Sequence, residues 1–125
     1  MSSRVAQQPM EGIELARSFA RVADENRAED VVILDLRGIS SVADFFVIAT
    51  GTSDRQLRAI ADQIDQDAKS MGHQRFGLSG YETASWVLVD FVDVVVHLFD
   101  ASRRKYYDLE LLWGDAPRID WSPTT

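Results

Sequence analysis

ADFFVIATGTSDRQLRAIADQID, residues 43–65, is the stretch of sequence that decides the fold class of this chain. Its first part, FFVIAT, is almost continuously hydrophobic, as a strand covered on both faces requires. Gly51 ends this strand, and Ser53 with Gln56 then forms the capping-box pattern that begins a helix. A buried strand that turns at once into a capped helix predicts an α/β fold.

The segments on either side of this stretch extend the same pattern. Apolar residues recur at helical spacing from Leu57 to Met71, and Gly72 supplies the stop. Upstream, residues 11–26 place their apolar side chains on one broad helical face, which predicts an amphipathic helix. The β-branched run VVILDL, residues 31–36, then has the length and composition of a strand.

The C-terminal half adds two strands and a short helix. WVLV at 86–89 and VVVHLF at 94–99 predict an antiparallel pair joined through an acidic turn at 90–93, and residues 74–80 form a short strand or a loop. Ser102 or Asp100 can cap a last helix that ends at Gly114. The apolar face expected for this helix comprises Tyr106, Leu109, Leu112 and Trp113. Together the elements predict a single mixed β-sheet flanked by helices.

Length and composition limit the number of domains and the class of partner that the chain can have. We expect a disordered segment over 1–10, one domain over 11–115 and a flexible tail over 116–125. Thirteen basic and twenty acidic residues give a net charge of −7, which disfavours nucleic acid and favours a basic protein partner. Cysteine is absent, no run approaches the roughly 20 apolar residues of a membrane span, and the first ten residues lack a secretory core. We expect a cytoplasmic protein.

Few side chains suggest catalysis. Asp90 and Asp93 lie in the predicted turn, where aspartates commonly accept backbone hydrogen bonds, and Asp35 in another strand could converge on them to hold magnesium. This possibility keeps a magnesium-dependent nucleotide-binding or nucleotidyl-transferring enzyme as an alternative function. His97 lies among β-branched residues, as expected of a hydrogen-bonded core or edge histidine. Gly51 starts a strand-to-helix turn without the further glycine and lysine of a phosphate loop.

The aromatic residues are the more informative set, because such side chains dominate binding hot spots. Trp86, at the start of a strand after small polar residues, is the best candidate for a partly exposed anchor. Trp113, at the end of an amphipathic face, is expected to pack inward. The aromatic residues of the C-terminal half are Tyr81, Trp86, Tyr106, Tyr107 and Trp113.

Three segments in order, ADFFVIATGTSDRQLRAIAD, WVLVDFVDVVVHLF and RKYYDLELLWGDA, resemble the ribosomal silencing factor family (RsfS, also called Iojap-related) over residues 11–115. The resemblance implies a nucleotidyltransferase-like fold without catalytic residues, cofactor or metal, and hence a binding protein rather than an enzyme. It further implies docking on the large ribosomal subunit through ribosomal protein L-fourteen. The bound protein would block joining of the small subunit and repress translation under nutrient limitation.

The resemblance also implies which residues bind the partner, with Trp86 foremost. The others are Tyr81, Asp93, Arg104, Tyr106, Tyr107, Glu110 and Leu111. Residues 103–105, all basic, are expected to lie nearest to any peripheral rRNA. Val92 stands where the family usually has glycine, so we expect a wider turn there, because β-branched residues resist positive φ. A homodimer formed through a sheet edge or the aromatic residues is a third possibility.

Overall fold

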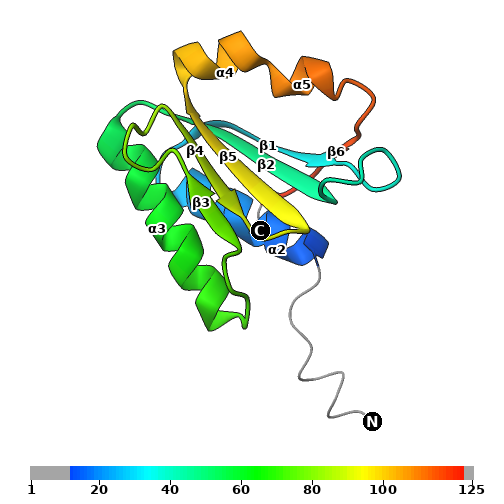
Figure 1. Ribbon diagram of the computed structural model, residues 1–125, viewed down its shortest axis with the longest axis horizontal. Coiled ribbons are helices and arrows are strands. Elements are labelled where there is room, and N and C mark those ends of the chain that lie inside the picture. Colours follow the sequence, from blue (N-terminus) through cyan, green and yellow to red (C-terminus); the bar gives the residue numbers. More distant parts are fainter. Residues whose placement is uncertain (1–11, 123–125) are drawn as a thin grey trace.

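The computed structural model describes residues 12–122, which form one six-stranded β-sheet with helices on both faces (Figure 1). The strand order is β3-β4-β5-β2-β1-β6. The strands are β1 (Glu29–Asp35), β2 (Phe45–Gly51), β3 (Gly77–Ser79), β4 (Trp86–Asp90), β5 (Val94–Asp100) and β6 (Arg118–Ile119). The helices are α2 (Gly12–Glu25), α3 (Asp54–Ser70), α4 (Ala101–Tyr107) and α5 (Leu109–Leu112). The mixed α/β prediction is confirmed.

The centre of the sheet is the parallel pair β2 and β5, in register from Phe45 opposite Val94 to Gly51 opposite Asp100. Every residue of β2 is buried, as its continuous hydrophobicity predicts for a strand covered on both faces. The other neighbouring pairs are antiparallel, including the predicted β4–β5 pair. The sheet is therefore mixed.

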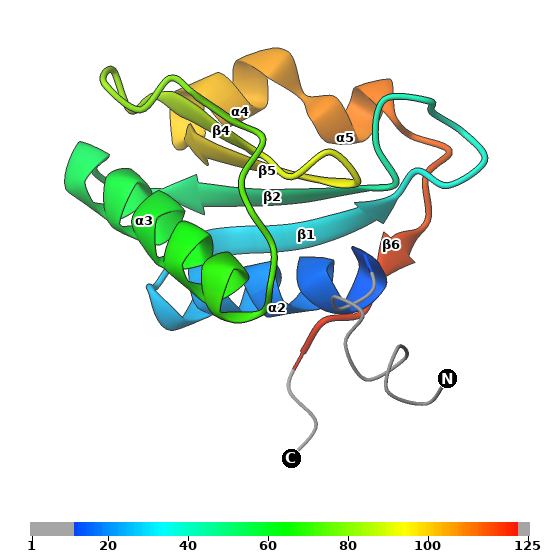
Figure 2. The same cartoon turned by 60° about the horizontal axis from the view of Figure 1, so that its bottom comes forward.

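Helices α2 and α3 lie together on one face of the sheet (Figure 2). Their apolar stripes bury Phe19 of α2 and Ile60 and Ile64 of α3 completely against inward-facing residues of the strands. Phe19 also contacts Phe91, with ring centroids 4.8 Å apart. This layer is the main hydrophobic core, and both helices occur where the sequence predicts them.

The turn from β2 into α3 shows why the sequence has glycine there. A Cβ at Gly51 would lie 2.5 Å from the side chain of Leu57, so any larger residue would displace this core leucine. Ser53 is the N-cap, and its side chain accepts a hydrogen bond from the Gln56 amide at 3.1 Å. Gln56 in turn accepts from the Thr52 amide. The predicted strand, turn and capping pattern are confirmed. The glycine is required because the Leu57 side chain packs directly against the turn.

The opposite face of the sheet carries a smaller hydrophobic cluster. Leu34, Phe46 and Phe99 are buried there, and Leu109 and Trp113 pack over them from the α5 region. Trp113 meets Phe46 edge to face, with centroids 6.1 Å apart. Figures 1 and 2 show α4 and α5 on the side of the sheet away from α2 and α3. The inward packing expected of Trp113 is confirmed.

The C-terminal part of the chain departs from the predicted flexible tail over 116–125. Arg118–Ile119 form β6 and pair with Leu34 and Ile33 at the edge of the sheet. The indole N–H of Trp121 then donates to the Val31 carbonyl at 3.0 Å. The ordered domain thus extends through residue 122, whereas the predicted disordered segment 1–10 lies outside the described residues. None of the helices within 12–122 is both long and apolar enough to span a membrane.

Candidate partner-binding surface

Asp100 and Asp108 give the α4–α5 region its shape. Asp100 caps α4, its carboxylate accepting a hydrogen bond from the Arg103 amide at 2.7 Å. Asp108 then adopts a left-handed conformation with φ of 45°, which ends α4, and its side chain caps α5. The single helix expected up to Gly114 is therefore two short helices. Asp is among the few residues that adopt this conformation at low cost and that favour N-caps.

The break at Asp108 changes which side chains point outward. Leu109 packs on the sheet, whereas Tyr106 and Leu112, expected on the same face, are 80% and 70% exposed. Tyr107 is 42% exposed and Leu111 76% exposed. Such an accumulation of exposed large apolar side chains on two adjoining helices is typical of an interaction site. We call this surface the α4–α5 patch: Trp86, Tyr106, Tyr107, Leu111 and Leu112.

Trp86 connects the patch to the sheet. It begins β4 opposite Phe99, and its ring lies 5.0 Å from Phe99 and 4.4 Å from Tyr107, measured between centroids. Its indole N–H donates to Nδ1 of His97 at 3.2 Å. Trp86 is half-buried, as predicted for an anchor at the start of a strand. The ring is therefore held in one position from two sides.

His97 lies beneath this aromatic group and is only 4% exposed. Because Nδ1 accepts from Trp86, the neutral imidazole carries its proton on Nε2, which has no hydrogen-bond partner and faces apolar surroundings. Burial lowers the pKa of His97 to about 4, so the ring is neutral near neutral pH. The prediction of a hydrogen-bonded core histidine is confirmed.

An ion-pair network fastens the helices that carry the patch to the sheet. Arg104, whose side chain is 12% exposed, donates to Glu110 at 3.1 Å, to the Thr50 hydroxyl at 2.9 Å and to the Asp30 carbonyl. Arg118 of β6 contacts the other oxygen of Glu110 at 3.2 Å. Arg104 and Glu110 lie beside the patch, and their charges are already paired by ion pairs within the protein. The structure thus gives them a supporting role next to the predicted binding role.

Tyr81 and Asp93 lie apart from the patch. The Tyr81 hydroxyl donates to Asp62 of α3 at 2.9 Å, which raises the pKa of the phenol, and its ring packs on the α2–α3 core. Asp93 precedes β5, whereas α4 follows this strand, so seven strand residues separate Asp93 from the first residue of α4. The structure brings the rings of Trp86, Tyr106 and Tyr107 into contact, places Leu111 on the adjoining helix α5, and leaves Tyr81 and Asp93 elsewhere. Sequence reasoning missed Leu112, because it was assigned to the inward face.

The turn between β4 and β5 stays tight, against the expectation of a wider turn at Val92. Val92 has a φ of 75°, the Asp93 amide donates to the Phe91 carbonyl at 3.0 Å, and Asp90 accepts from the Val92 amide at 2.7 Å. A hydrogen bond across one residue at this φ belongs to the strained form of the γ-turn. The β-branched residue therefore adopts the conformation that glycine would adopt more easily.

The predicted convergence of Asp35 on Asp90 is not found. Asp35 is in β1 and Asp90 in β4, three strand positions apart, or about 14 Å at ordinary strand spacing. Asp35 forms a bidentate ion pair with Arg37, at 2.8 and 3.0 Å, and the guanidinium lowers the pKa of the Asp35 carboxyl. Within residues 12–122, no group of three or more His, Cys, Asp or Glu side chains is arranged to hold a metal ion. The three-carboxylate arrangement expected for the magnesium alternative is therefore not found among these residues.

The fold and the surface define a class of protein: a small mixed α/β domain that presents an exposed aromatic and aliphatic patch. The sequence model of the family "Ribosomal silencing factor during starvation" (RsfS) matches residues 9–125. The chain therefore belongs to the RsfS family, which establishes the resemblance noted from its sequence motifs and places it among regulators of translation.

Similar proteins agree with this assignment. The chain is 52% identical over 101 residues to the ribosomal silencing factor RsfS of Bacillus subtilis, covering 81% of this chain and 86% of that protein. It is 46% identical over 111 residues to RsfS of Halalkalibacterium halodurans, covering 89% and 95%. The chloroplastic protein Iojap of Zea mays is 34% identical over 113 residues, covering 88% of this chain and 48% of the maize protein.

The fold is also that of a solved structure. The crystal structure of a Chromobacterium violaceum protein superposes with a TM-score of 0.81 at 33% sequence identity, covering 92% of this chain and 95% of that chain. The mixed sheet with its two helical layers is thus an architecture already observed by crystallography.

Proposed function

We propose that this protein binds the large ribosomal subunit in the cytoplasm through ribosomal protein L-fourteen. There it blocks association with the small subunit and so represses translation under nutrient limitation. It acts as a binding protein, without an active site, on a nucleotidyltransferase-like framework. Membership of the RsfS family supports a role at the ribosome. The α4–α5 patch supports the mode of binding, because large apolar side chains gather there on two helices that are held to the sheet.

The patch has the make-up of a binding hot spot. Trp86 is the anchor at its base, already desolvated on one side by Phe99 and Tyr107. Tyr106 and Leu111 stand exposed around it and would be buried on contact. Aromatic anchors surrounded by residues that exclude water account for most of the energy in protein interfaces. A rigid patch also loses little conformational entropy on binding.

Charge supports a basic protein partner. The chain carries a net charge of −7, which accelerates encounter with a positively charged protein and disfavours extended contact with rRNA. Arg103 and Lys105 are exposed, whereas Arg104 is bound within the protein. We therefore propose that any peripheral rRNA contact involves Arg103 and Lys105, a narrower set than the three basic residues expected from the sequence.

The test is co-sedimentation with separated ribosomal subunits, followed by a subunit-association assay. The variant combines Tyr106→Ala and Leu111→Ala, two positions whose exposure leaves folding intact. Loss of this contact should weaken binding to the large subunit by about 30-fold, equivalent to ~2 kcal/mol, and abolish the block. The matched control is Phe76→Ala, because Phe76 is 75% exposed but precedes β3, away from the patch. Equal binding by the patch variant and the control would refute the proposed surface.

The patch could also pair with a second copy of the chain, and we propose this as a storage form that hides the binding surface. The sheet edges favour the patch over edge pairing, because β3 has three residues and β6 has two. Sizing at several concentrations tests this idea. A dimer that dissociates in the Tyr106→Ala, Leu111→Ala variant supports it, and a monomer at every concentration refutes it.

A further inference from the structure

The connection between β3 and β4, residues 80–85, leads directly into Trp86 of the α4–α5 patch, and we call it the anchor loop. Gly80 begins the loop with a φ of 76°, and a Cβ there would lie 2.0 Å from the Trp86 carbonyl oxygen. The Ala84 amide donates back to the Gly80 carbonyl at 2.9 Å, which closes the loop on itself. The loop is therefore a compact unit that packs against the main chain of Trp86.

Two side chains of α3 hold the anchor loop. The Arg58 guanidinium donates to the carbonyls of Tyr81 and Glu82, at 3.0 and 2.9 Å, and lies over the Tyr81 ring, 5.9 Å from its centroid. One helical turn later, Asp62 accepts from the Tyr81 hydroxyl at 2.9 Å. Each of these hydrogen bonds involves a charged group, and such bonds are stronger than those between neutral groups. Arg58 forms two of the three and is thus the main link between α3 and the loop that precedes Trp86.

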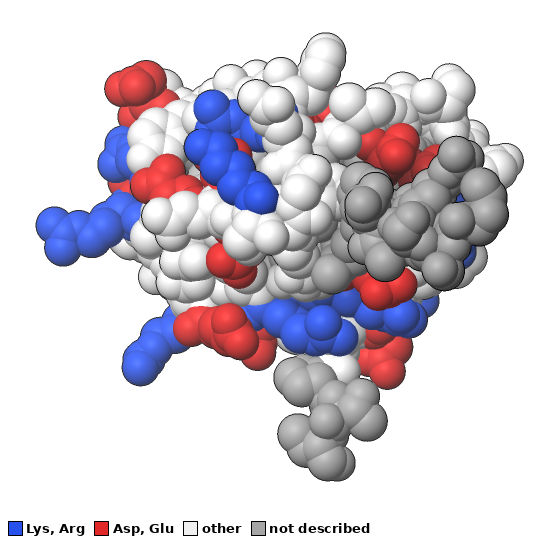
Figure 3. Space-filling model, turned by 90° about the horizontal axis from the view of Figure 1, so that it is seen from below, with Lys and Arg blue, Asp and Glu red and all other residues white. Residues whose placement is uncertain are grey.

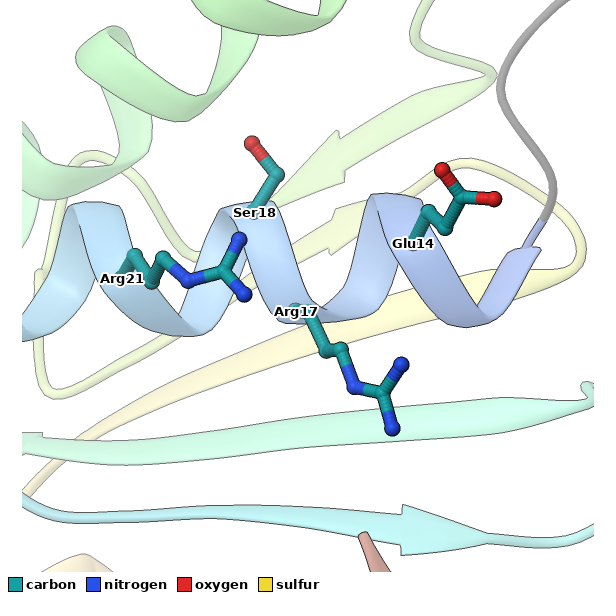
Figure 4. A pocket seen from close by; sticks show the side chains of 4 residues that line it. All are labelled: Glu14, Arg17, Ser18 and Arg21. Carbon is teal, nitrogen blue, oxygen red and sulfur yellow. The ribbon is translucent and has the colours of Figure 1, made fainter. Parts of the chain in front are cut away.

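Arg58 differs from other arginines of the helical layer in what its side chain binds. Figure 3, which views the molecule from the side of α2, shows basic and acidic side chains close together, as is usual for a solvent-exposed surface. Arg17, on the outward face of α2 (Figure 4), binds one main-chain carbonyl, that of Asp120, at 3.0 Å. Between residues 12 and 122, only Arg58 binds two consecutive carbonyls. Because its N–H groups form a rigid fork, this pair of bonds fixes the direction of the main chain.

Trp86 depends on such support because it stands at the end of a strand. It is the first residue of β4, opposite Phe99 in β5, and one main-chain bond continues past this pair, from the Asp100 amide to the Ser85 carbonyl at 3.0 Å. Strand ends open more readily than strand centres. Opening of this end would take the indole N–H of Trp86 away from Nδ1 of His97 and the ring away from the patch. Holding the preceding loop therefore holds the ring.

We propose that Arg58 is a positioning residue for Trp86: it fixes the anchor loop and so keeps the Trp86 ring where the partner meets it. This proposal rests on the proposed function, in which Trp86 is the anchor of the interface. It extends the determinants of binding to α3, a helix on the face of the sheet opposite the α4–α5 patch (Figure 2). Arg58 acts through Trp86 and needs no contact of its own with the partner.

The experiment follows the indole N–H of Trp86 in the full chain by NMR and compares Arg58→Gln with Arg55→Gln. Both substitutions remove one arginine charge from α3, but Arg55 is exposed and has no side-chain partner within residues 12–122. The signal is identified by its loss in Trp86→Phe. We expect Arg58→Gln to accelerate hydrogen exchange of the indole by about tenfold and to weaken large-subunit binding by about fivefold. Arg55→Gln should change neither quantity, and Arg58→Lys, which keeps a charged donor, should recover part of both losses.

The amides of the central strands β2 and β5 serve as the internal reference, because they exchange only when the whole domain opens. An unchanged Trp86 indole in Arg58→Gln would overturn the proposal. An acceleration shared equally by the reference amides would also overturn it, since this result would indicate a general loss of stability. An accelerated indole with wild-type binding to the large subunit would confirm the positioning by Arg58 and refute the proposed role of Trp86 at the interface. The two proposals therefore fail in distinguishable ways.

Discussion

Val92 concentrates backbone strain in a single exposed residue. Its φ of 75° is unfavourable for a β-branched side chain, and the side chain is 53% exposed, so it recovers little by packing. Strain of this kind costs about 1–3 kcal/mol, whereas glycine adds about 0.5–1 kcal/mol of chain entropy to the unfolded state. We expect Val92→Gly to raise the free energy of unfolding by about 1 kcal/mol.

Urea unfolding measures this change, as a higher midpoint at an unchanged slope. The control is Val42→Gly, another exposed valine but at an ordinary φ, where the same substitution should only destabilise. If both glycines lower the midpoint, the turn is not strained. The sequence indicated that Val92 conflicts with a tight turn. It could not show whether the turn would widen or Val92 would adopt a positive φ. The hydrogen bonds of Asp90 and Asp93 to this turn decide the outcome.

His97 links the stability of the fold to pH. Its pKa is about 4 in the folded protein and about 6.5 when unfolded, so the unfolded chain binds the extra proton between these values. Stability is therefore fully present above pH 6.5 and falls as the pH drops toward 4. The expected loss from this group between pH 7 and pH 4 is about 3 kcal/mol.

We expect His97→Gln to lose less stability than the wild type over this range, because glutamine keeps a hydrogen-bond acceptor for Trp86 but does not titrate. The measurement is the free energy of unfolding in urea at pH 7 and at pH 4. Carboxylates titrate in both proteins, so the difference between the two pH dependences isolates the histidine. Identical dependences would mean that folding does not lower the pKa of His97.

At the scale of the elements, the α4–α5 region depends on one carboxylate shared by two arginines. Arg104 is nearly buried, whereas Arg118 is 63% exposed. Glu110→Gln should therefore lower the free energy of unfolding by about 1–3 kcal/mol, chiefly by leaving the Arg104 charge without compensation. Arg118→Gln should change it by less than about 1 kcal/mol, as is usual for an exposed ion pair.

Chemical denaturation of the two variants checks this order, and binding to the large subunit gives a second readout. Glu110→Gln should weaken binding by loosening the helices that carry Tyr106 and Leu111, whereas Arg118→Gln should bind as the wild type does. Equal stability losses in the two variants would show that the burial of Arg104 does not matter. Equal binding would remove the link between the network and the patch.

Regular elements with a strong local pattern were predictable from the sequence, and elements that depend on distant contacts were not. The β2–α3 unit has a hydrophobic run, a required glycine and a cap, all within residues 45–57. In contrast, β6 has two residues and exists only because it pairs with β1. The break at Asp108 had a usable signal, since aspartate both tolerates the left-handed conformation and begins helices. In the candidate site, the half-buried position of Trp86 was predictable, whereas the exposure of Tyr106 and Leu112 was not, because it depends on the break at Asp108.

For the whole molecule, the three layers of the fold set how far the protein would project from the partner to which it is bound. Helices α4–α5, the sheet, and helices α2–α3 stack on one another, and each layer adds about 10 Å, for a total of about 30 Å. A protein seated by the α4–α5 patch would therefore hold a second large surface well outside contact distance. On the proposed mechanism, its volume alone would exclude the small subunit, whatever residues face the incoming subunit.

This mechanism predicts that the outward face of α3 tolerates substitution. Arg55→Ala with Gln66→Ala changes two exposed side chains on that helix without altering its bulk. The double variant should bind the large subunit and prevent subunit association as the wild type does, measured by light scattering at matched occupancy. The patch variant Tyr106→Ala, Leu111→Ala should fail at binding itself. If the α3 variant bound fully but allowed association, specific contacts of α3 would be required, and exclusion by volume would be refuted.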